Sequence, residues 1–429
     1  MSRESRASTW ISRALRAFGD VRPAEVVGVA AMFANLTLLL LGYYILKTAR
    51  EPLILATGGA EMKAYAAGAQ ALLLMGFVPA YGWLASRVRR MKLIVTLNVV
   101  FVVCLQLFWL GATLKVPHLG FVFFVWVGIF SLSTIAQFWS FANEVYEEGV
   151  ANRLFPIIAI GATIGAPAGS ALAAWLFSHD VEARTLLQIA AALLVAHTAL
   201  YFVCRRAFGR TKWAREEEPL AAVGGFKLVL KGRYLRRIAL LLVVLNLVNT
   251  TGEYILAKFV TVAAQAQDAA RVEAYIGAFY GEFFSVVNVS AVALQAFLAP
   301  RLTKRFGVGG VLFLLPLVSL GTYALAAAGV GFAVFRWAKI AENSTDYSLM
   351  NTAKAMLWLP TSTKAKYKAK QAIDTFFVRF GDVLAAGTVW MGTTWLAFGQ
   401  RQFAAFNLAL AALFLMFATL IYRSYHAEE

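Results

Sequence analysis

The chain consists mainly of long apolar runs that are separated by short polar segments. Most runs reach the length of about 20 residues at which an α-helix crosses the hydrocarbon core of a bilayer. Lipid offers no partner to backbone N–H and C=O groups, so these runs are expected to be helices. Twelve runs are found, at residues 27–49, 64–86, 93–114, 119–145, 154–178, 185–204, 237–260, 276–299, 308–329, 330–358, 371–397 and 402–422.

The composition agrees with this pattern. Of the 429 residues, 60% are hydrophobic, and the mean hydropathy is +0.67. Soluble globular domains are only about half apolar. The sequence therefore predicts an all-α, multi-pass integral membrane protein with twelve transmembrane helices.

Lysine and arginine are distributed unevenly between the two sets of loops. With the N-terminus in the cytoplasm, 28 of the 40 Lys and Arg residues fall in cytoplasmic segments and 5 in outside loops. The five outside residues are Lys63, Lys115, Arg184, Arg271 and Arg401. Positive charge marks cytoplasmic loops, so we expect both termini in the cytoplasm. A bacterial inner membrane is a separate expectation, which the charge distribution does not itself give. The net charge of +17 then reflects topology and contact with anionic membrane lipids, and does not argue for nucleic acid.

A basic polar segment divides the twelve runs into six and six. Such a division is typical of the major facilitator architecture, in which two helix bundles are related by an axis along the membrane normal. Runs five and eleven both carry closely spaced small residues, which indicates either an internal repeat or helix packing alone. The predicted parts are an amphipathic cytoplasmic N-terminus (1–26), a six-helix bundle (27–204), a cytoplasmic linker (205–236), a second six-helix bundle (237–422) and a cytoplasmic tail (423–429).

Ionisable residues inside apolar runs are candidates for function, because charge is costly in lipid. The first run ends with Lys47, Arg50 and Glu51. Lys47 and Arg50 are three residues apart, so they share a helix face and do not neutralise each other. Two interpretations stay open, namely charges that reach the headgroups at a helix end and a clamp for phosphate. Glu51 is a candidate for gating or coupling.

Two later runs carry isolated acids. Glu253 lies in run seven, with Lys258 five residues further on. It is expected either to form a structural salt bridge or to gate the carrier by changing partners between states. Glu282 lies in an aromatic-rich part of run eight, where a lone acid is expected to face a cavity. We take Glu253 as a substrate-binding candidate and Glu282 as a gating or coupling candidate.

Run ten is the most polar of the twelve. Arg336, Lys339, Asn343 and Asp346 follow one another at steps of three and four residues, which aligns them on one stripe of a helix. A stripe of this polarity is expected to line water or a ligand. Further candidates for substrate binding are Asn143, Lys354 and Asp374, and further candidates for gating or coupling are Glu144, Asp346 and Arg379.

A lysine-rich segment follows run ten. Pro360 precedes Lys364, Lys366, Lys368 and Lys370. Buried ammonium groups need a negative partner, so either water or an anionic ligand is expected at this segment. The alternative is that these lysines satisfy the cytoplasmic charge bias and touch anionic lipid.

Motifs of metal and phosphoryl chemistry are missing from the sequence. It contains no Walker loop, no zinc-protease motif and no catalytic Ser/His/Asp order. The four histidines are scattered, and both cysteines, Cys104 and Cys204, lie in apolar runs. Neither a metal cluster nor a disulfide framework is expected. The sequence thus predicts a secondary transporter without a cofactor, and not an enzyme.

Three segments resemble the ATP/ADP translocase family of plastids and intracellular bacteria. One runs from "YSL" at residues 347–349 to "KYKAKQAID" at residues 366–374. Another is "FWSFAN" at residues 138–143, which is followed by Arg153 and Pro156. The third is "YYILKTAREPL", at the end of the first run. The order and spacing of these segments hold over most of the chain.

The resemblance implies exchange of ATP for ADP, and some members of that family move other nucleotides or NAD. Carried over by position, Lys47 or Arg50 would be the basic residue at the end of helix one, and Glu253 the glutamate of helix seven. The late lysine of the family would fall among Lys366, Lys368 and Lys370. The chain departs from the family at Thr48, where an acid is usual, and in a late loop that lacks acids.

The leading hypothesis is a membrane transporter that exchanges nucleotides, ATP for ADP, by alternating access. In this hypothesis Lys47 or Arg50 pairs with Glu253 in the empty carrier and releases it to hold phosphate. One alternative is a divergent member of the family for a related anionic molecule. Another is a proton-coupled carrier of an organic anion, with Glu282, Glu253 or Asp374 as the coupling acid. The sequence sets no oligomeric state.

Overall fold

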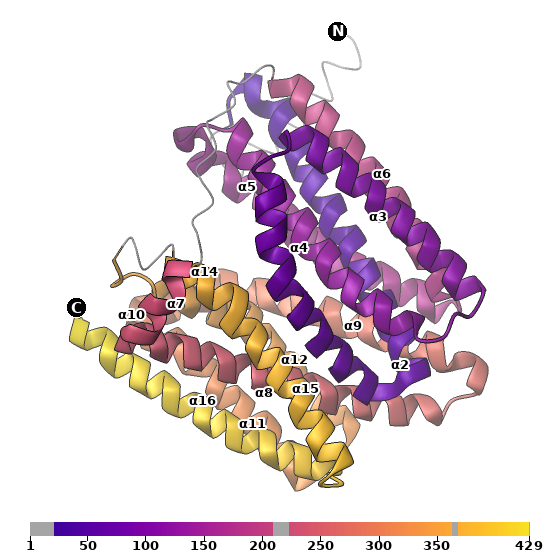
Figure 1. Ribbon diagram of the computed structural model, residues 1–429, viewed down its shortest axis with the longest axis vertical. Helices are drawn as coiled ribbons and strands as arrows, with labels where there is room; N and C mark the ends of the chain where they lie inside the picture. The colour runs from indigo at the N-terminus through magenta and orange to yellow at the C-terminus, as the bar shows by residue number, and fades with distance from the viewer. Residues whose placement is uncertain (1–20, 209–222, 363–367, 429) are drawn as a thin grey trace.

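The computed structural model describes residues 21–208, 223–362 and 368–428. These residues are helical apart from short turns, and they form two bundles that meet at one end (Figure 1). Eight of the described helical segments are long and apolar enough to cross a membrane. One of them, Val26–Ala85, holds two predicted runs, and Leu314–Ala328 is a shorter apolar helix. The prediction of an all-α membrane protein with twelve transmembrane helices in two six-helix bundles is confirmed.

The first bundle begins with a 3-10 turn and a very long helix. Its elements are η1 (Pro23–Glu25), α2 (Val26–Ala85), α3 (Arg90–Thr113), α4 (Leu119–Val145), α5 (Glu148–Ser178) and α6 (Ala183–Phe208). Helix α2 supplies two crossings, because the chain turns back at Gly59. The φ angle of Gly59 is 68°, in the left-handed region that favours glycine.

The second bundle contains more interrupted helices than the first. Its elements are α7 (Val223–Lys231), α8 (Arg233–Gln265), η2 (Ala269–Arg271), α9 (Val272–Ala293), η3 (Leu294–Leu298), α10 (Ala299–Leu312), α11 (Leu314–Ala328), α12 (Phe332–Thr345), η4 (Asp346–Met350), α13 (Asn351–Met356), α14 (Lys370–Ala372), η6 (Ile373–Phe377), α15 (Val378–Thr394) and α16 (Gln400–Glu428). Three of these elements, η3, η4 and η6, are π-helical turns inside longer helices. Such turns are rare and occur frequently at functional sites.

The small residues of runs five and eleven serve close helix packing. A Cβ atom on Gly161, Gly165 or Gly169 of α5 would lie 2.4–2.7 Å from a carbonyl oxygen of the first crossing of α2. A Cβ atom on Gly381 of α15 would lie 2.6 Å from the carbonyl oxygen of Val243 in α8. Each segment therefore packs against the first membrane-crossing helix of its own bundle, which is the arrangement expected of two equivalent bundles.

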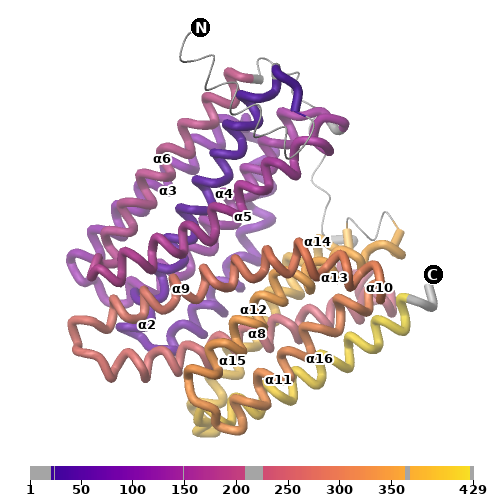
Figure 2. Tube along the Cα trace, turned by 180° about the vertical axis from the view of Figure 1, so that it is seen from behind, coloured from indigo at the N-terminus to yellow at the C-terminus, as the bar shows by residue number. Residues whose placement is uncertain are grey.

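The two bundles converge at one end and diverge at the other (Figures 1 and 2). We call the end at which the chain leaves α6 and enters α7 the linker end, and the opposite one the far end. At the far end, Tyr254 donates a hydrogen bond of 3.0 Å to Glu61, and Lys258 forms an ion pair with the same carboxylate. The backbone N–H of Ala183 donates to Glu273 at 2.7 Å. These contacts join the first bundle to the second.

Candidate functional site

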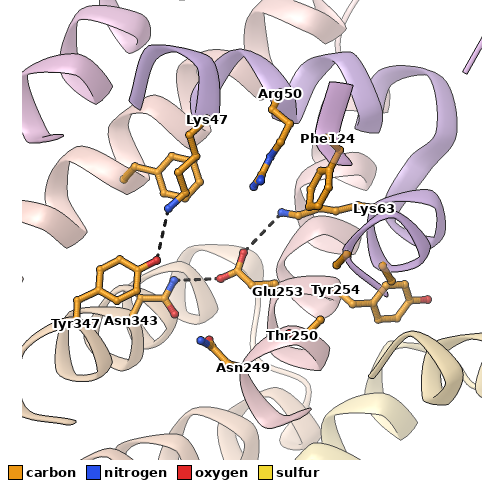
Figure 3. Close-up of a pocket in the computed structure, with 13 residues that line it drawn as sticks. Lys47, Arg50, Lys63, Phe124, Asn249, Thr250, Glu253, Tyr254, Asn343 and Tyr347 are labelled. Atoms are coloured by element: carbon orange, nitrogen blue, oxygen red, sulfur yellow. Dashed lines mark hydrogen bonds and ion pairs between the residues drawn. The ribbon is translucent and has the colours of Figure 1, made fainter. Parts of the chain in front are cut away.

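A cavity of about 180 Å³ lies between the bundles (Figure 3). Both crossings of α2 and part of α4 form its first-bundle wall, and α8, α9, α12 and η4 form its second-bundle wall. The polar and charged side chains that line it are Lys47, Arg50, Lys63, Asn249, Thr250, Glu253, Tyr254, Asn343 and Tyr347. Three of the four charged lining residues are cations, and all three belong to α2.

Lys47 faces this cavity among aromatic rings. Its ammonium nitrogen lies 5.0 Å from the ring centroid of Tyr44, 4.4 Å from that of Phe284 and 5.6 Å from that of Tyr347. It also donates a long hydrogen bond of 3.5 Å to the hydroxyl of Tyr347 (Figure 3). Within the described part of the chain, no carboxylate lies within ion-pair distance of Lys47. The rings offer attraction to a cation but do not cancel its charge.

Arg50 and Lys63 share a buried carboxylate. The Glu51 side chain is 0% exposed, and it forms ion pairs with Arg50 at 2.7 Å and with Lys63 at 2.8 Å. Arg50 also stacks on Phe124, with its guanidinium carbon 3.9 Å from the ring centroid. The turn at Gly59 brings Lys63, on the second crossing of α2, back beside Arg50 on the first.

Glu253 connects the two walls of the cavity. One carboxylate oxygen lies 3.6 Å from the ammonium of Lys63, and the other lies 3.8 Å from that of Lys339. The side-chain amide of Asn343 donates to Glu253 at 3.0 Å (Figure 3). The first-bundle cation within ion-pair distance is therefore Lys63, whereas the sequence hypothesis paired Glu253 with Lys47 or Arg50. Lys258, which lies five residues after Glu253 in the sequence, pairs with Glu61 instead.

Neutral hydrogen-bonding groups make up most of the second-bundle wall. Asn249 accepts from Lys339 at 3.4 Å and donates to Asp346 at 3.3 Å, which fixes the orientation of its amide. Thr250 donates to Asp382 of α15 at 2.7 Å. These contacts leave the wall with oriented amide and hydroxyl groups, which suit a neutral polar part of a ligand.

The polar stripe predicted along run ten divides between two surroundings. Lys339, Asn343 and Asp346 all contact residues of α8 at the cavity wall. Arg336 instead pairs with Glu282 of α9 at 2.9 Å. The side chain of Glu282 is 60% exposed and does not line the cavity, so it is not the lone cavity-facing acid expected from the sequence.

The remaining sequence candidates lie toward the linker end. Lys354 pairs with Asp346 at 3.4 Å. Three further contacts are the ion pair of Lys370 with Asp374, the ion pair of Arg379 with Asp382 at 3.7 Å and the ion pair of Glu144 with Arg90 at 3.3 Å. Asn143 is exposed and Lys368 is half-buried. Lys364 and Lys366 lie outside the described residues.

Arg153, which follows the "FWSFAN" segment, binds an acid just before the first crossing. Its guanidinium donates to both carboxylate oxygens of Glu25, at 2.9 and 2.7 Å. Glu25 precedes the membrane-spanning part of α2, and the hydrogen bonds from Arg153 hold its pKa below the ordinary value. This pair ties the start of the first crossing to the start of α5.

The predicted loop position of Lys63 is wrong. The sequence assigns it to an outside loop, but it lies within α2 and is 6% exposed. The apolar runs on either side of Gly58 and Gly59 are separated by polar residues, a pattern that predicts a loop at Lys63. The adjacent glycines were a signal for a tight turn that keeps flanking residues inside the protein.

No family model matches the chain. ADP,ATP carrier protein 1 of Chlamydia muridarum is 26% identical over 292 residues, which is 57% of this chain and 53% of that protein. ADP,ATP carrier protein 3 of Rickettsia conorii is 22% identical over 299 residues, 58% of each chain. The chloroplastic ADP,ATP carrier protein 1 of Arabidopsis thaliana is 24% identical over 332 residues, 63% of this chain and 51% of that protein. The chain is a distant homologue of ADP,ATP carrier proteins. It spans about half the length of the curated relatives it matches.

Solved structures share the fold over almost the whole chain. The nucleoside transporter NupG has a TM-score of 0.66 at 14% identity, and the match covers 90% of this chain and 98% of that one. A bacterial homologue of the human lysosomal transporter Spinster, in an inward-facing and unoccupied conformation, has a TM-score of 0.67 at 15% identity, with 96% and 99% covered. The architecture is that of major facilitator transporters, as predicted, and the homologues and structural neighbours are transporters, not enzymes.

Proposed function

We propose that this transporter exchanges ATP for ADP by alternating access, with its linker end in the cytoplasm of a bacterium. The distant homology to ADP,ATP carrier proteins supports this substrate class. The three sequence segments that resemble the translocase family support it as well. In the proposal, the cavity between the bundles is the substrate site.

The main support for the proposal is that Lys47 faces the cavity without a carboxylate partner among the described residues. A cation inside a membrane protein is costly unless something negative meets it. Arg50 and Lys63 have Glu51, whereas the described residues offer Lys47 aromatic rings and one long hydrogen bond to the Tyr347 hydroxyl, but no carboxylate within ion-pair distance. A phosphate group of the substrate supplies the missing negative charge in a charge-assisted hydrogen bond.

The two walls take the two ends of a nucleotide. The phosphates lie against the cations of α2, and the ribose and base lie against Asn249, Thr250 and Asn343. Small-molecule sites usually hold about 300–1,000 Å³, so the cavity of about 180 Å³ is too narrow for a whole nucleotide. The walls must move apart to admit the substrate, as alternating access requires.

Lys63 and Glu253 form a link between the bundles that a phosphate can replace. Their distance of 3.6 Å is long for an ion pair, and Lys63 already has a closer partner in Glu51. An incoming anion competes with Glu253 for Lys63 and so weakens the link. A ligand shifts a conformational equilibrium by its difference in affinity for the two states. Because this link joins the bundles when no anion is bound, the empty carrier switches slowly between its two states. The carrier then switches mainly with substrate bound, which makes transport an exchange.

Uptake of labelled ATP into proteoliposomes tests the proposal. Vesicles preloaded with ADP are expected to take up ATP many times faster than empty vesicles. Lys47→Gln is expected to weaken ATP binding at least about tenfold, because a charge-assisted hydrogen bond contributes about 1.5–3 kcal/mol. Lys115→Gln, in an exposed loop, is the matched control.

Two outcomes would contradict nucleotide exchange. Transport that is driven by a pH gradient and is indifferent to internal ADP would favour the proton-coupled alternative. Each acid nominated for that role has a cation partner, since Glu282 pairs with Arg336, Asp374 with Lys370, and Glu253 with Lys63. Transport of another organic anion without competition by nucleotides would favour a divergent substrate.

A further inference from the structure

Lys339 forms an ion pair behind the second-bundle wall of the cavity. Its side chain is 0% exposed and lies 2.7 Å from Glu342. Glu342 also accepts hydrogen bonds from Ser319 at 2.7 Å and from Tyr323 at 2.8 Å. Replacing a fully buried ion pair by apolar residues is often neutral or stabilising. Stability alone therefore does not account for this pair.

The ammonium of Lys339 also reaches the cavity wall. It lies 3.4 Å from the amide oxygen of Asn249 and 3.8 Å from Glu253. Gly252 provides the space for this approach, because a Cβ atom there would lie 2.8 Å from the Lys339 nitrogen. A cation that is already paired with Glu342 thus extends toward a second carboxylate.

Glu253 faces a different cation with each of its two oxygens. Oε2 faces Lys63 of the first bundle, and Oε1 faces Lys339 of the second bundle. Neither distance is as short as those from Lys63 to Glu51 or from Lys339 to Glu342. Glu253 is therefore shared between the bundles and held closely by neither. Asn343, which belongs to the same helix as Lys339, holds it on the second-bundle side.

We propose that Lys339 is a positioning residue that holds Glu253 on the second bundle once an anion has bound to Lys63. This inference rests on the proposed function, because it requires an anionic substrate at the cations of α2. Without Lys339, Glu253 has Lys63 as its remaining cation within ion-pair distance in the described chain. It then competes with the substrate for that cation. Lys339 thus sets substrate affinity through Glu253, without touching the substrate.

The double variant Lys339→Met/Glu342→Gln tests this role, because it removes both charges of the pair and leaves neither unpaired. Binding of ADP and of pyrophosphate to the purified, detergent-solubilised protein is measured by calorimetry. We expect the affinity for both probes to fall about tenfold. Adding Glu253→Gln removes the competitor, so the triple variant is expected to bind as tightly as Glu253→Gln alone. Arg153→Met/Glu25→Gln, which neutralises an ion pair outside the cavity, is the control and should bind as the unsubstituted protein does.

A milder variant covers the case in which the double variant does not fold. Tyr323→Phe removes one hydrogen-bond donor from Glu342 and one acceptor from Lys339, so Glu342 draws Lys339 more strongly and Glu253 is held less well. We expect a loss of about twofold to threefold in affinity that disappears when Glu253→Gln is added.

The readouts separate the two proposals. Unchanged affinity in the Lys339 variants, or an equal loss with and without Glu253, would overturn the positioning role. Binding of pyrophosphate but not of ADP would reject nucleotide exchange, and the pyrophosphate titrations would still decide the role of Lys339. Binding of neither probe by the unsubstituted protein would reject both proposals.

Discussion

The two walls of the cavity differ in chemistry and in the part of the chain that supplies their polar groups. The first-bundle wall carries Lys47, Arg50 and Lys63, all from the two crossings of α2. The second-bundle wall takes its polar groups from two separate helices, α8 and α12 with η4. One wall offers mainly charge and the other mainly oriented amides and hydroxyls.

Under the proposed function, this difference assigns a different part of the substrate to each bundle. Charge acts at a distance and with little regard to shape, so the first-bundle wall would bind any compact polyanion. Amide and hydroxyl groups select by geometry, so the second-bundle wall would distinguish the neutral part of the substrate. A ligand with both parts would contact both walls and so couple binding to movement of the bundles.

Of the substitutions in the two walls, the removal of Lys63 should have the largest effect, and that effect is on the stability of the first-bundle wall. Lys63→Met leaves the buried carboxylate of Glu51 with Arg50 alone, and breaking a buried ion pair costs about 3–5 kcal/mol. We expect a large fall in the thermal unfolding temperature of the purified protein, and partial recovery when Glu51→Gln is added. The exposed Lys115→Met serves as the control. If Lys63→Met is as stable as that control, the first-bundle wall is not held by this ion pair.

Thr250→Val tests the role of the second-bundle wall. The substitution removes a lining hydroxyl and its hydrogen bond to Asp382. A neutral hydrogen bond between this hydroxyl and ADP would contribute about 0.5–1.5 kcal/mol to binding, so ADP affinity should fall by about threefold to tenfold. Pyrophosphate, which lacks a base and ribose, should bind as before. Equal losses for both probes in calorimetry would show that the walls do not divide the substrate.

Substitution of the late lysines, Lys366, Lys368 and Lys370, should have the smallest effect on ADP binding. Lys366→Ala and Lys368→Ala are expected to weaken ADP binding several-fold if these residues guide the anion from the linker end. Lys370→Ala should change it by about twofold or less, because Lys370 is half-exposed and Asp374 offsets its charge. Three variants indistinguishable from the unsubstituted protein in an ADP binding assay would leave these lysines as topology signals.

The fold could be predicted from the sequence because each helix carries its own signal. Apolar runs of bilayer length specify transmembrane helices without reference to the rest of the chain. Lys47 and Arg50 could be singled out for the same reason, since a charge in such a run stands out locally. The structure places both at the cavity.

The pairing of charges could not be predicted, because it depends on which helices meet. Glu253 is only five residues from Lys258 but is shared by Lys63 and Lys339, which are far away in sequence. Glu282 looked isolated in its own run, yet Arg336 of another helix lies beside it. Helical periodicity gives the face of a residue on its own helix and does not identify the neighbour of that face.

The charge balance around the cavity has a consequence for the response to membrane voltage. Lys47, Arg50, Lys63 and Lys339 stand against Glu51, Glu253 and Glu342, which is an excess of one positive charge among these seven described groups. A bound polyphosphate reverses that sign. Each elementary charge moved through a potential of 100 mV gains or loses about 2.3 kcal/mol. For the proposed nucleotide exchange across a bacterial inner membrane, an inside-negative potential would favour the cytoplasmic-facing state of the empty site and disfavour that state once the site is loaded.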